Sequence, residues 1–381
     1  MRLRSSESRW TLFLQEQKLV VGAGAIAAVF LATGRIDPHR VPEAVNVELL
    51  LLLLALILAV ELLRESNLLA NGVASVVPRF RSARSFTAAS VLFTGGLSAL
   101  VTNDVALFVA VPFTVLAGRV SGLRTRWAVM LQILAANLIG ALTPLGNPQN
   151  LYVFHESGWS AWRFVATMAP FVAWSLAGIL VALPILEPRA AISVPAAPLR
   201  RVDRRRLLAG LAVFALILAE ILGLLPAWPA AILALAGSAL LIRGKIGEID
   251  LFILPLFFFA FLVVEGLRSF DVYRLFEQLP REPDGLSLYV TAILSSQIVS
   301  NVPATVLLAP LAGIRWSLLL YAVNAGGCGT MVASMANLIG WRLYVRETGG
   351  DPAFLRDFTI LQTAFLAWTA VGGWAIWRLL A

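Results

Sequence analysis

The chain has 381 residues, of which 59% are hydrophobic and 14% are charged, with a formal net charge of +8 and a mean hydropathy of +0.83. This composition excludes an ordinary soluble domain and predicts a multi-pass protein of the inner or plasma membrane, whose main partner is the lipid bilayer. One cysteine and two histidines exclude a disulfide framework and a soft-metal site, so we expect no metal and no cofactor.

Nine apolar runs of roughly spanning length follow one another along the chain. They are residues 19–33, 45–63, 126–155, 162–186, 206–224, 228–243, 250–268, 316–340 and 358–380. Two further segments, 85–118 and 287–312, each have two shorter apolar arms around a polar tip, so the chain leaves on the side from which it entered. We therefore expect an all-α membrane protein with about nine crossings and two re-entrant hairpins.

The basic residues are distributed unevenly between the two sides of this layout. Most of the 30 Lys and Arg residues lie on the side of the N-terminus. The positive-inside rule then places the N-terminus in the cytoplasm and the C-terminus outside. Because topology accounts for the basic excess, we expect no nucleic-acid partner.

The sequence also repeats itself. Residues 46–64 align with 250–268, TNDVALFVAVP (102–112) aligns with SNVPATVLLAP (300–310), and NLIGALTPLGNPQNL (137–151) aligns with NAGGCGTMVASMANL (324–338). The three blocks keep their order, and an odd number of crossings separates matching points, so the second copy is inverted. The expected parts are scaffold helices at 1–77 and 206–286, a hairpin with a broken helix at 78–186 and 287–381, and a basic cytoplasmic linker at 187–205.

Polar breaks interrupt the apolar runs at matching places in the two copies. GALTPLGNPQN and GGCGTMVAS would be the unwound middles of two broken helices, and TND and SN would be the tips of the two hairpins. For a single break, a kink satisfied by neighbouring helices is the alternative. Two matched pairs favour a binding site at mid-depth, where unwound backbone and helix ends face substrate and ions. From the aligned blocks we expect Asn137, Thr143, Gly146 and Asn324 to take part.

The combination TNDVALFVAVP, LTPLGNPQNLYV, SNVPATVLLAP and GCGTMVASMANLIG resembles the ion transporter superfamily, specifically its arsenite-permease and NhaD-type branch. Sodium-coupled divalent-anion symporters are more distant relatives. The resemblance implies a scaffold with a moving transport part, elevator-like alternating access, coupling to protons or sodium, and a homodimer as in the anion symporters. It implies that substrate and ions bind at the tip residues Thr102, Asn103, Ser300 and Asn301 and at the broken-helix residues Asn147, Asn150, Thr330, Ser334 and Asn337.

The second broken helix departs from the pattern of the first. Met331 stands where the first copy has Pro144. Its unwinding must therefore depend on the glycines at positions 326, 327 and 329.

Asp104 is the expected coupling residue. It follows the first hairpin tip, while its counterpart in the second copy is the neutral Val302. An ionisable group at membrane depth is a functional hypothesis by default, because it would either bind and release a proton or stay ionised beside sodium. The alternative is that Asp104 caps the helix that follows. A carboxylate here disfavours a dianion, and favours a neutral hydroxylated solute such as arsenous acid, or a cation.

The expected function is ion-coupled secondary transport, with efflux of arsenite or antimonite ranked first. Sodium/proton antiport and sodium-coupled uptake of a carboxylate or oxyanion are the alternatives, and a passive channel is a further class. No acid–base constellation or phosphate-binding loop indicates an enzyme, so direct drive by ATP would require a separate ATPase subunit.

Two charged pairs and the single cysteine have explanations that require no role in transport. Glu61 with Arg64, and Glu265 with Arg268, are spaced to pair along one helix face at a membrane interface, although their recurrence leaves a role in gating or domain contact open. Cys328 meets the need for a small residue among glycines, and contact with a metalloid is the alternative.

Overall fold

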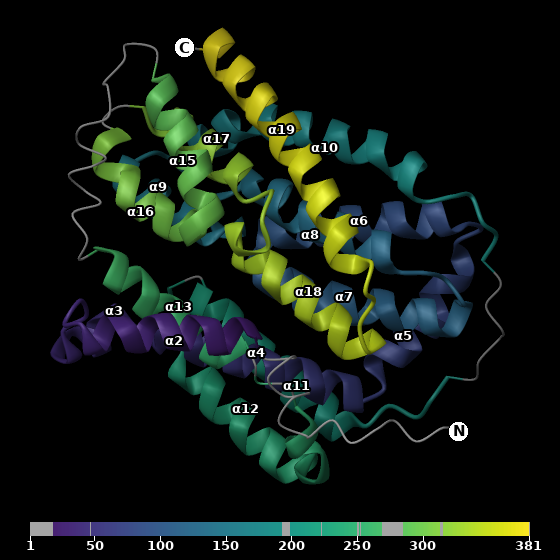
Figure 1. The fold of residues 1–381 in the computed structure, drawn as a ribbon. Helices are drawn as coiled ribbons and strands as arrows, with labels where there is room; N and C mark the ends of the chain where they lie inside the picture. The colour runs from purple at the N-terminus through teal and green to yellow at the C-terminus, as the bar shows by residue number, and fades with distance from the viewer. Residues whose placement is uncertain are drawn as a thin grey trace. The chain divides into compact units, whose positions relative to one another are not determined.

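The structure is a computed structural model that describes residues 18–45, 47–192, 199–221, 223–249, 251, 253–268, 285–312 and 315–380. These residues form helices joined by short connections and contain no strand, only one isolated bridge between Ser82 and Ala191 (Figure 1). The helices group into two units. Unit 1 consists of Met1–Ala59 and Ala212–Glu277, and unit 2 consists of Val60–Leu211 and Gln278–Ala381.

Unit 1 is built from apolar helices that pack on each other. Its elements are α2 (Lys18–Ala32), α3 (Val41–Ala44), α12 (Trp228–Leu241), α13 (Ile253–Arg268), most of α4 (Val47–Glu65) and part of α11 (Arg204–Ile221). Helices α2 and α13 are in contact, and their shared core contains Ala27 and Leu262 with Phe30 beside them. Gly266 allows this approach, because a Cβ there would overlap the ring of Phe30.

Unit 2 contains both hairpins and both broken helices. Its first half consists of α5 (Leu68–Val76), α6 (Ala83–Leu100), α7 (Asn103–Ser121), α8 (Arg126–Leu138), α9 (Pro148–Ser157) and α10 (Ala161–Leu186). Its second half consists of α15 (Leu286–Val299), α16 (Asn301–Ala312), α17 (Trp316–Gly326), α18 (Met335–Thr348) and α19 (Phe354–Leu380). Helix α6 begins with a capping box between Ser82 and Ser85, which satisfies its first backbone N–H groups.

The two predicted helix breaks are present. Between α8 and α9 the chain forms two single turns of 3-10 helix, Gly140–Leu142 and Pro144–Gly146. Between α17 and α18 it forms one such turn, Met331–Ala333, next to Gly329 at φ +104°. This conformation favours glycine, so the second copy unwinds without the proline that the first copy uses.

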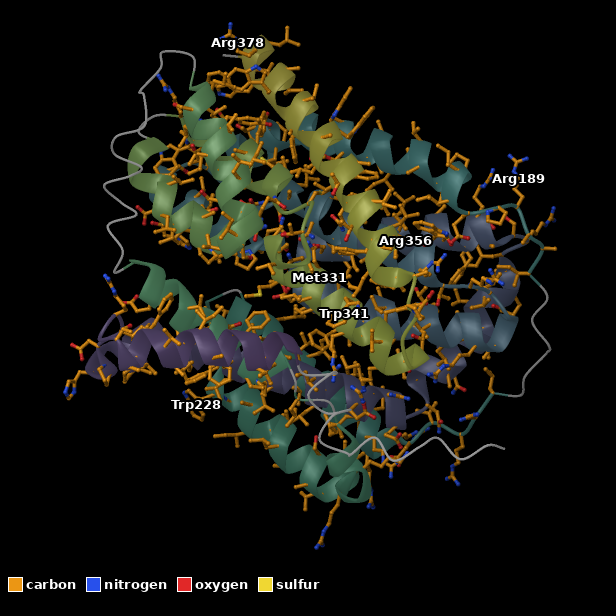
Figure 2. The ribbon with its side chains drawn as sticks, viewed as in Figure 1. Arg189, Trp228, Met331, Trp341, Arg356 and Arg378 are labelled. Atoms are coloured by element: carbon orange, nitrogen blue, oxygen red, sulfur yellow. The ribbon has the colours of Figure 1, made fainter. Side chains whose placement is uncertain are left out.

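Three helices in the described residues are long and apolar enough to cross a membrane by length and composition: α7, α10 and α19. The first hairpin is longer than predicted. It was expected at residues 85–118, whereas α6 begins at Ala83 and α7 ends at Ser121. Charged residues lie near the ends of the other two spans (Figure 2). Arg189 follows the end of α10, while Arg356 and Arg378 lie in the first and last turns of α19.

Candidate functional site

Four helices of unit 2 begin at the hairpin tips and helix breaks: α7, α9, α16 and α18. Helix α7 packs against α18, and α16 packs against α9, so the second arm of each hairpin meets the broken helix of the other sequence repeat. The N-cap residues of α9 and α18 are Asn147 and Ser334, both extended, and neither side chain caps its own helix. Their polar atoms instead join a buried group of side chains, which we call the amide cluster.

Asn137, at the end of α8, is the first hub of the amide cluster. Its Oδ1 accepts hydrogen bonds from Asn103 Nδ2 at 3.3 Å and from Ser334 Oγ at 2.9 Å. Its Nδ2 donates to Asn337 Oδ1 at 3.0 Å. One buried amide thus connects the first hairpin tip to the second broken helix.

Asn324, near the end of α17, is the second hub. Its Oδ1 accepts from Asn147 Nδ2 and from Gln149 Nε2, each at 3.1 Å. Its Nδ2 donates to Asn150 Oδ1 at 2.7 Å. This hub connects the second broken helix to the first.

The contacts of the two hubs are reciprocal. In the repeat alignment, residue 137 corresponds to 324, residue 147 to 334, and residue 150 to 337. Two of the three side-chain partners of each hub correspond to partners of the other hub. The matching contacts are Asn137–Ser334 with Asn324–Asn147, and Asn137–Asn337 with Asn324–Asn150.

Several oxygen atoms in and beside the amide cluster are buried without a hydrogen-bond partner among the described residues. They are Oδ1 of Asn103, Oδ1 of Asp104, Oδ1 of Asn147 and Oε1 of Gln149. Buried polar atoms are normally paired, and these four all lack a donor. The cluster can therefore accept a proton donor or a cation.

The other predicted site residues hold the breaks in shape. Thr143 donates its hydroxyl to the carbonyl oxygen of Ala99, and Ser300, at φ +74°, donates to that of Ala333. Thr330 is exposed and donates to the carbonyl of Gln297. Asn301 is buried, and a Cβ on residue 327 would lie 2.9 Å from its Nδ2.

Thr102, and not Asp104, caps α7. The hydroxyl oxygen of Thr102 accepts from the backbone N–H of Val105, and Asp104 lies inside the first turn. The capping alternative for Asp104 is therefore wrong. The Asp104 side chain is 7% exposed and forms no ion pair with a described residue. This carboxyl group is available for a partner that the described residues do not supply.

Four polar residues that contact the site were not predicted from the sequence. Gln149 bonds to Asn324, Gln297 Nε2 donates to the carbonyl oxygens of residues 326 and 328, and Ser98 Oγ donates to the carbonyl of residue 136. Ser296, which is aligned with Ser98 by the same offset as the hairpin tips, lies against Gly326. That offset was the available signal for the two serines.

Gly146 is required by the first break. A Cβ at this position would overlap the carbonyl oxygen of Gly140 and would lie 3.1 Å from that of Ser98. We expect Gly146→Ala to destabilise the protein by about 1–3 kcal/mol and to reduce transport, since the backbone must shift. Thermal unfolding of the purified variant measures this. Gly96→Ala, where a Cβ meets nothing within 4 Å, is the control. Equal melting temperatures of Gly146→Ala and the wild type would contradict the requirement for glycine at this position.

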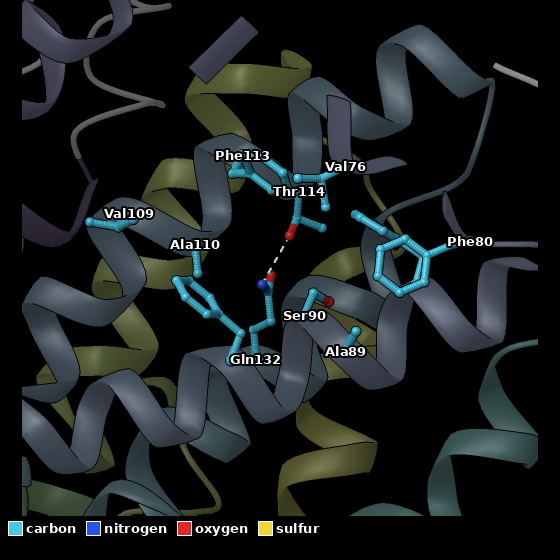
Figure 3. Close-up of a pocket in the computed structure, with 11 residues that line it drawn as sticks. Val76, Phe80, Ala89, Ser90, Val109, Ala110, Phe113, Thr114 and Gln132 are labelled. Atoms are coloured by element: carbon cyan, nitrogen blue, oxygen red, sulfur yellow. Dashed lines mark hydrogen bonds between the residues drawn. The ribbon is translucent and has the colours of Figure 1, made fainter. Parts of the chain in front are cut away.

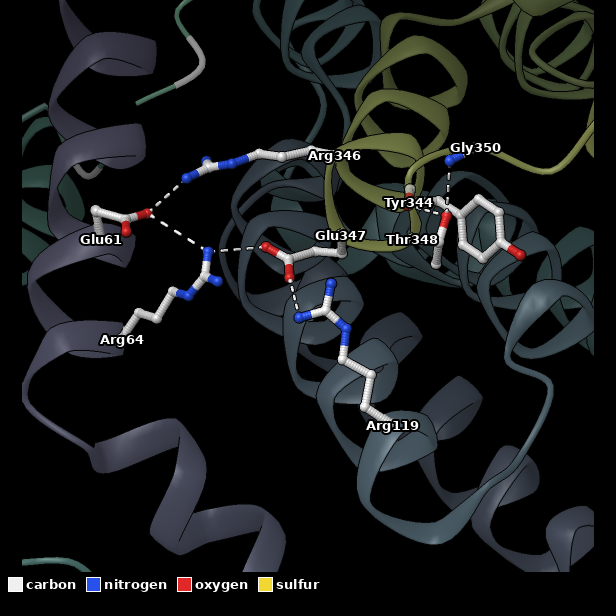
Figure 4. Close-up of polar contacts among 8 residues, drawn as sticks. All are labelled: Glu61, Arg64, Arg119, Tyr344, Arg346, Glu347, Thr348 and Gly350. Atoms are coloured by element: carbon white, nitrogen blue, oxygen red, sulfur yellow. Dashed lines mark hydrogen bonds and ion pairs between the residues drawn. The ribbon is translucent and has the colours of Figure 1, made fainter. Parts of the chain in front are cut away.

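Ion pairs join the ends of three helices in unit 2 (Figure 4). Glu61 Oε2 lies 2.8 Å from Arg346 Nη2, and Glu347 lies 3.0 Å from Arg64 and 3.5 Å from Arg119. The expected pair within α4 is weak by comparison, since Glu61 and Arg64 are 4.0 Å apart. These residues form a contact between helices, which pairing along one helix face does not include. The side chain of Arg268 lies outside the described residues.

We expect Glu347→Gln to lower the stability of the protein, because Arg64 and Arg119 would both lose their carboxylate partner. The carboxylate is nearly buried but the two arginines are partly exposed, so an effect of about 1 kcal/mol is appropriate. Thermal melting at low and high salt measures it, and the difference from the wild type should shrink at high salt. Glu156→Gln, at an exposed position, is the control. A loss of stability that is equally large at low and at high salt would contradict the ionic explanation.

Neither a metal centre nor an accessible thiol is found in the described residues. No group of three or more His, Cys, Asp or Glu side chains there could hold a metal ion. Cys328 is fully buried, and its carbonyl oxygen accepts from Gln297.

Comparison with known proteins identifies related chains. Residues 10–314 match the family model described as citrate transporter, CitMHS. An uncharacterised transporter of Methanocaldococcus jannaschii is 32% identical over 322 residues, covering 84% of this chain and 87% of the relative. The inner membrane protein YbiR of Escherichia coli is 32% identical over 303 residues, covering 79% of each chain. An uncharacterised transporter of Mycobacterium tuberculosis is 23% identical, covering 89% of this chain and 87% of the relative.

Proposed function

Because this chain belongs to the citrate transporter family CitMHS, we propose that it is an ion-coupled secondary transporter whose substrate and coupling ion bind at the amide cluster. The family and the names of the relatives identify a membrane transporter. The observation that carries the finer proposal is the set of four buried oxygen atoms without a partner in the described part of the chain. Carboxylate and amide oxygens are ligands that suit a hard cation, and they equally accept protons from a hydroxylated solute.

The charges around the cluster favour a neutral substrate or a cation. Asp104 brings a carboxyl group, and no Lys or Arg of the described residues bonds to a member of the cluster. The N-termini of α7, α9, α16 and α18 supply only partial positive charge. We therefore rank a small hydroxylated solute such as arsenous or antimonous acid first, moved by a proton or sodium gradient, and sodium/proton antiport next.

Uptake of a carboxylate is the third candidate, and the family model favours it. A carboxylate could bind with its negative groups toward the helix N-termini while a cation at Asp104 offsets the remaining charge. This arrangement requires that cation and substrate bind together. Substrate flux should then depend steeply on the cation.

Alternating access between a scaffold and a moving part is the mechanism that we propose. The reciprocal contacts of Asn137 and Asn324 support two inverted repeats. Unit 2 contains both hairpins and both broken helices, whereas α2, α12 and α13 belong to unit 1. This grouping supports a transport part in unit 2 and a scaffold in unit 1. Shared carboxylates join Arg64, Arg119 and Arg346. This supports the placement of the three arginines on one side of the membrane, the cytoplasmic side. A homodimer and a location in the inner or plasma membrane complete this proposal.

The test is transport by purified protein in proteoliposomes under imposed proton and sodium gradients. Arsenite, sodium and a dicarboxylate are presented in turn, with and without an ionophore. Accumulation of any of them that collapses with the ionophore supports coupled transport, and the substrate that accumulates selects among the three candidates. Flux that only equalises the substrate concentration on the two sides of the membrane, and that depends on neither gradient, would indicate a passive channel and would contradict the proposal.

A further inference from the structure

A cavity of about 390 Å³ lies within unit 2, between the two arms of the first hairpin and the helices beside them (Figure 3). Residues of α5, α6, α7 and α8 and of the turn after α5 line it. In Figure 3, Val76 and Phe80 lie at one end of the cavity and Val109 lies at the other. The lining residues Phe86 and Phe93 of α6 are about 10 Å apart along the helix axis, at 1.5 Å per residue. The lining therefore follows α6 for about two turns.

The walls of this cavity are almost entirely apolar. Phe80, Phe86, Phe93 and Phe113 contribute four aromatic rings. Phe93 is 57% exposed and the adjacent Leu92 is 48% exposed, so the cavity meets an apolar outer face of α6. In a membrane protein such a face contacts acyl chains, and each CH₂ group that enters the cavity adds to the free energy of binding.

The polar residues of the lining direct their polar atoms toward the protein. Ser90 donates its hydroxyl proton to the carbonyl oxygen of Thr87. Gln132 Nε2 donates to Thr114 Oγ1 at 2.9 Å, as Figure 3 shows, and the oxygen of this amide is buried. The cavity itself thus offers nothing to a polar headgroup. A polar part of any occupant must lie outside it.

Basic side chains gather at the end of the cavity that is formed by the turn after α5. Arg79 and Arg81 flank the lining residue Phe80 in the sequence, and both are exposed. The backbone N–H of Ile192 donates to the carbonyl oxygen of Arg81, which brings the segment after α10, with the exposed Arg189, alongside. Three cationic groups therefore share one end of an apolar cavity.

These three arginines are not neutralised within the described part of the chain. None of them forms an ion pair there, and the carboxylate of Glu187, two residues before Arg189, is 5% exposed and pairs with no arginine. A further exposed arginine lies next to α5, because Asn71 donates to the carbonyl oxygen of Arg200. This surface suits a negatively charged group.

We propose that this cavity binds one acyl chain of an anionic phospholipid whose phosphate lies at Arg79, Arg81 and Arg189. The apolar walls accept the chain, and arginines clustered at a membrane surface attract anionic headgroups. A cavity of about 390 Å³ lies in the range of roughly 300–1,000 Å³ that is usual for ligand sites. Because the walls belong to both arms of the first hairpin, the bound chain holds α6 and α7 together. The inference goes beyond the proposed transport function and does not depend on the substrate.

The test is native mass spectrometry of the full chain, stripped of lipid in detergent. The probes are phosphatidylglycerol and phosphatidylcholine with the same acyl chains, which differ in net charge but not in hydrocarbon. We expect one molecule of phosphatidylglycerol to bind about 10-fold more tightly than phosphatidylcholine, because only the first carries a net negative charge. Equal affinities would overturn the proposal. Inorganic phosphate in large excess should not displace the lipid, and displacement would indicate a simple anion site and would also overturn it.

One pair of variants tests the place of the acyl chain. Ala89→Leu fills the cavity from a partly exposed wall and should weaken the binding of both lipids at least about 10-fold. Ala88→Leu, outside the lining, should bind both lipids as the wild type does. Unchanged binding in Ala89→Leu would place the chain elsewhere and would overturn the proposal.

A second pair of variants tests the place of the phosphate, and it decides even if Ala89→Leu fails to fold. The double variant Arg79→Gln with Arg81→Gln changes only exposed side chains and should lower the affinity for phosphatidylglycerol to that for phosphatidylcholine. Arg204→Gln with Arg205→Gln removes the same charge from exposed positions at the start of α11, outside the lining, and should keep the preference. A preference that survives in the first double variant would remove these arginines from the site.

Discussion

Replacing Asp104 with asparagine is expected to reduce gradient-driven transport by roughly 100-fold, which corresponds to about 2.7 kcal/mol. The side chain is 7% exposed, its Oδ1 has no partner among the described residues, and its counterpart in the second repeat is Val302. This carboxyl group thus follows Asn103, a member of the amide cluster, which already supplies neutral oxygens. Asparagine keeps the size and an acceptor oxygen but cannot exchange a proton or balance the charge of a cation.

The effect of Asp104→Asn should be on coupling and not on folding. Thr102 caps α7 in its place, so the helix start is retained, and the melting temperature should stay within a few degrees of the wild type. Uptake under a proton gradient and under a sodium gradient is measured in the same liposomes. Asp351→Asn, a carboxylate that pairs with Arg126 outside the site, is the matched control and should transport normally. Coupled flux that survives in Asp104→Asn would remove this residue from the mechanism.

The positions of the helix breaks could be predicted from the sequence because their causes are local. Pro144 and Pro148 remove backbone donors, and Gly329 adopts a backbone conformation that other residues avoid. The repeat alignment then located the second break without a proline. The helix cap could not be predicted, since Thr102, Asn103 and Asp104 are all good N-cap residues, and only the backbone conformation distinguishes them.

The residues that the sequence missed are those whose role depends on distant partners. Gln149 corresponds to Ala336 in the second repeat, so the alignment gave no reason to select it. Glu61 has an arginine three residues away, yet its closest partner is Arg346, far along the chain. A spacing rule describes one helix, whereas an ion pair between helices depends on how they pack.

Alanine at Asn137 is expected to lower stability by about 3 kcal/mol or more and to abolish transport. The substitution removes three side-chain hydrogen bonds and leaves buried polar atoms of Asn103, Ser334 and Asn337 without a partner, each at a cost of about 1–3 kcal/mol. Because Asn324 has the corresponding contacts, alanine there should have a similar effect. Denaturation of each variant in detergent, together with transport in liposomes, measures the two consequences.

A control variant, a double variant and a comparison of the two hubs test this prediction further. Asn71→Ala, which removes two exposed hydrogen bonds to the backbone of Arg200, is the control and should cost about 1 kcal/mol. The pair Asn137→Ala with Asn337→Ala should be less destabilising than the sum of the single changes, since the two residues share a hydrogen bond. If Asn324→Ala were tolerated while Asn137→Ala was not, the two repeats would be equivalent in geometry but not in energy. Substrate would then bind mainly at the half of the cluster that contains Asn103, next to Asp104 in the sequence, and the second half would act as its support.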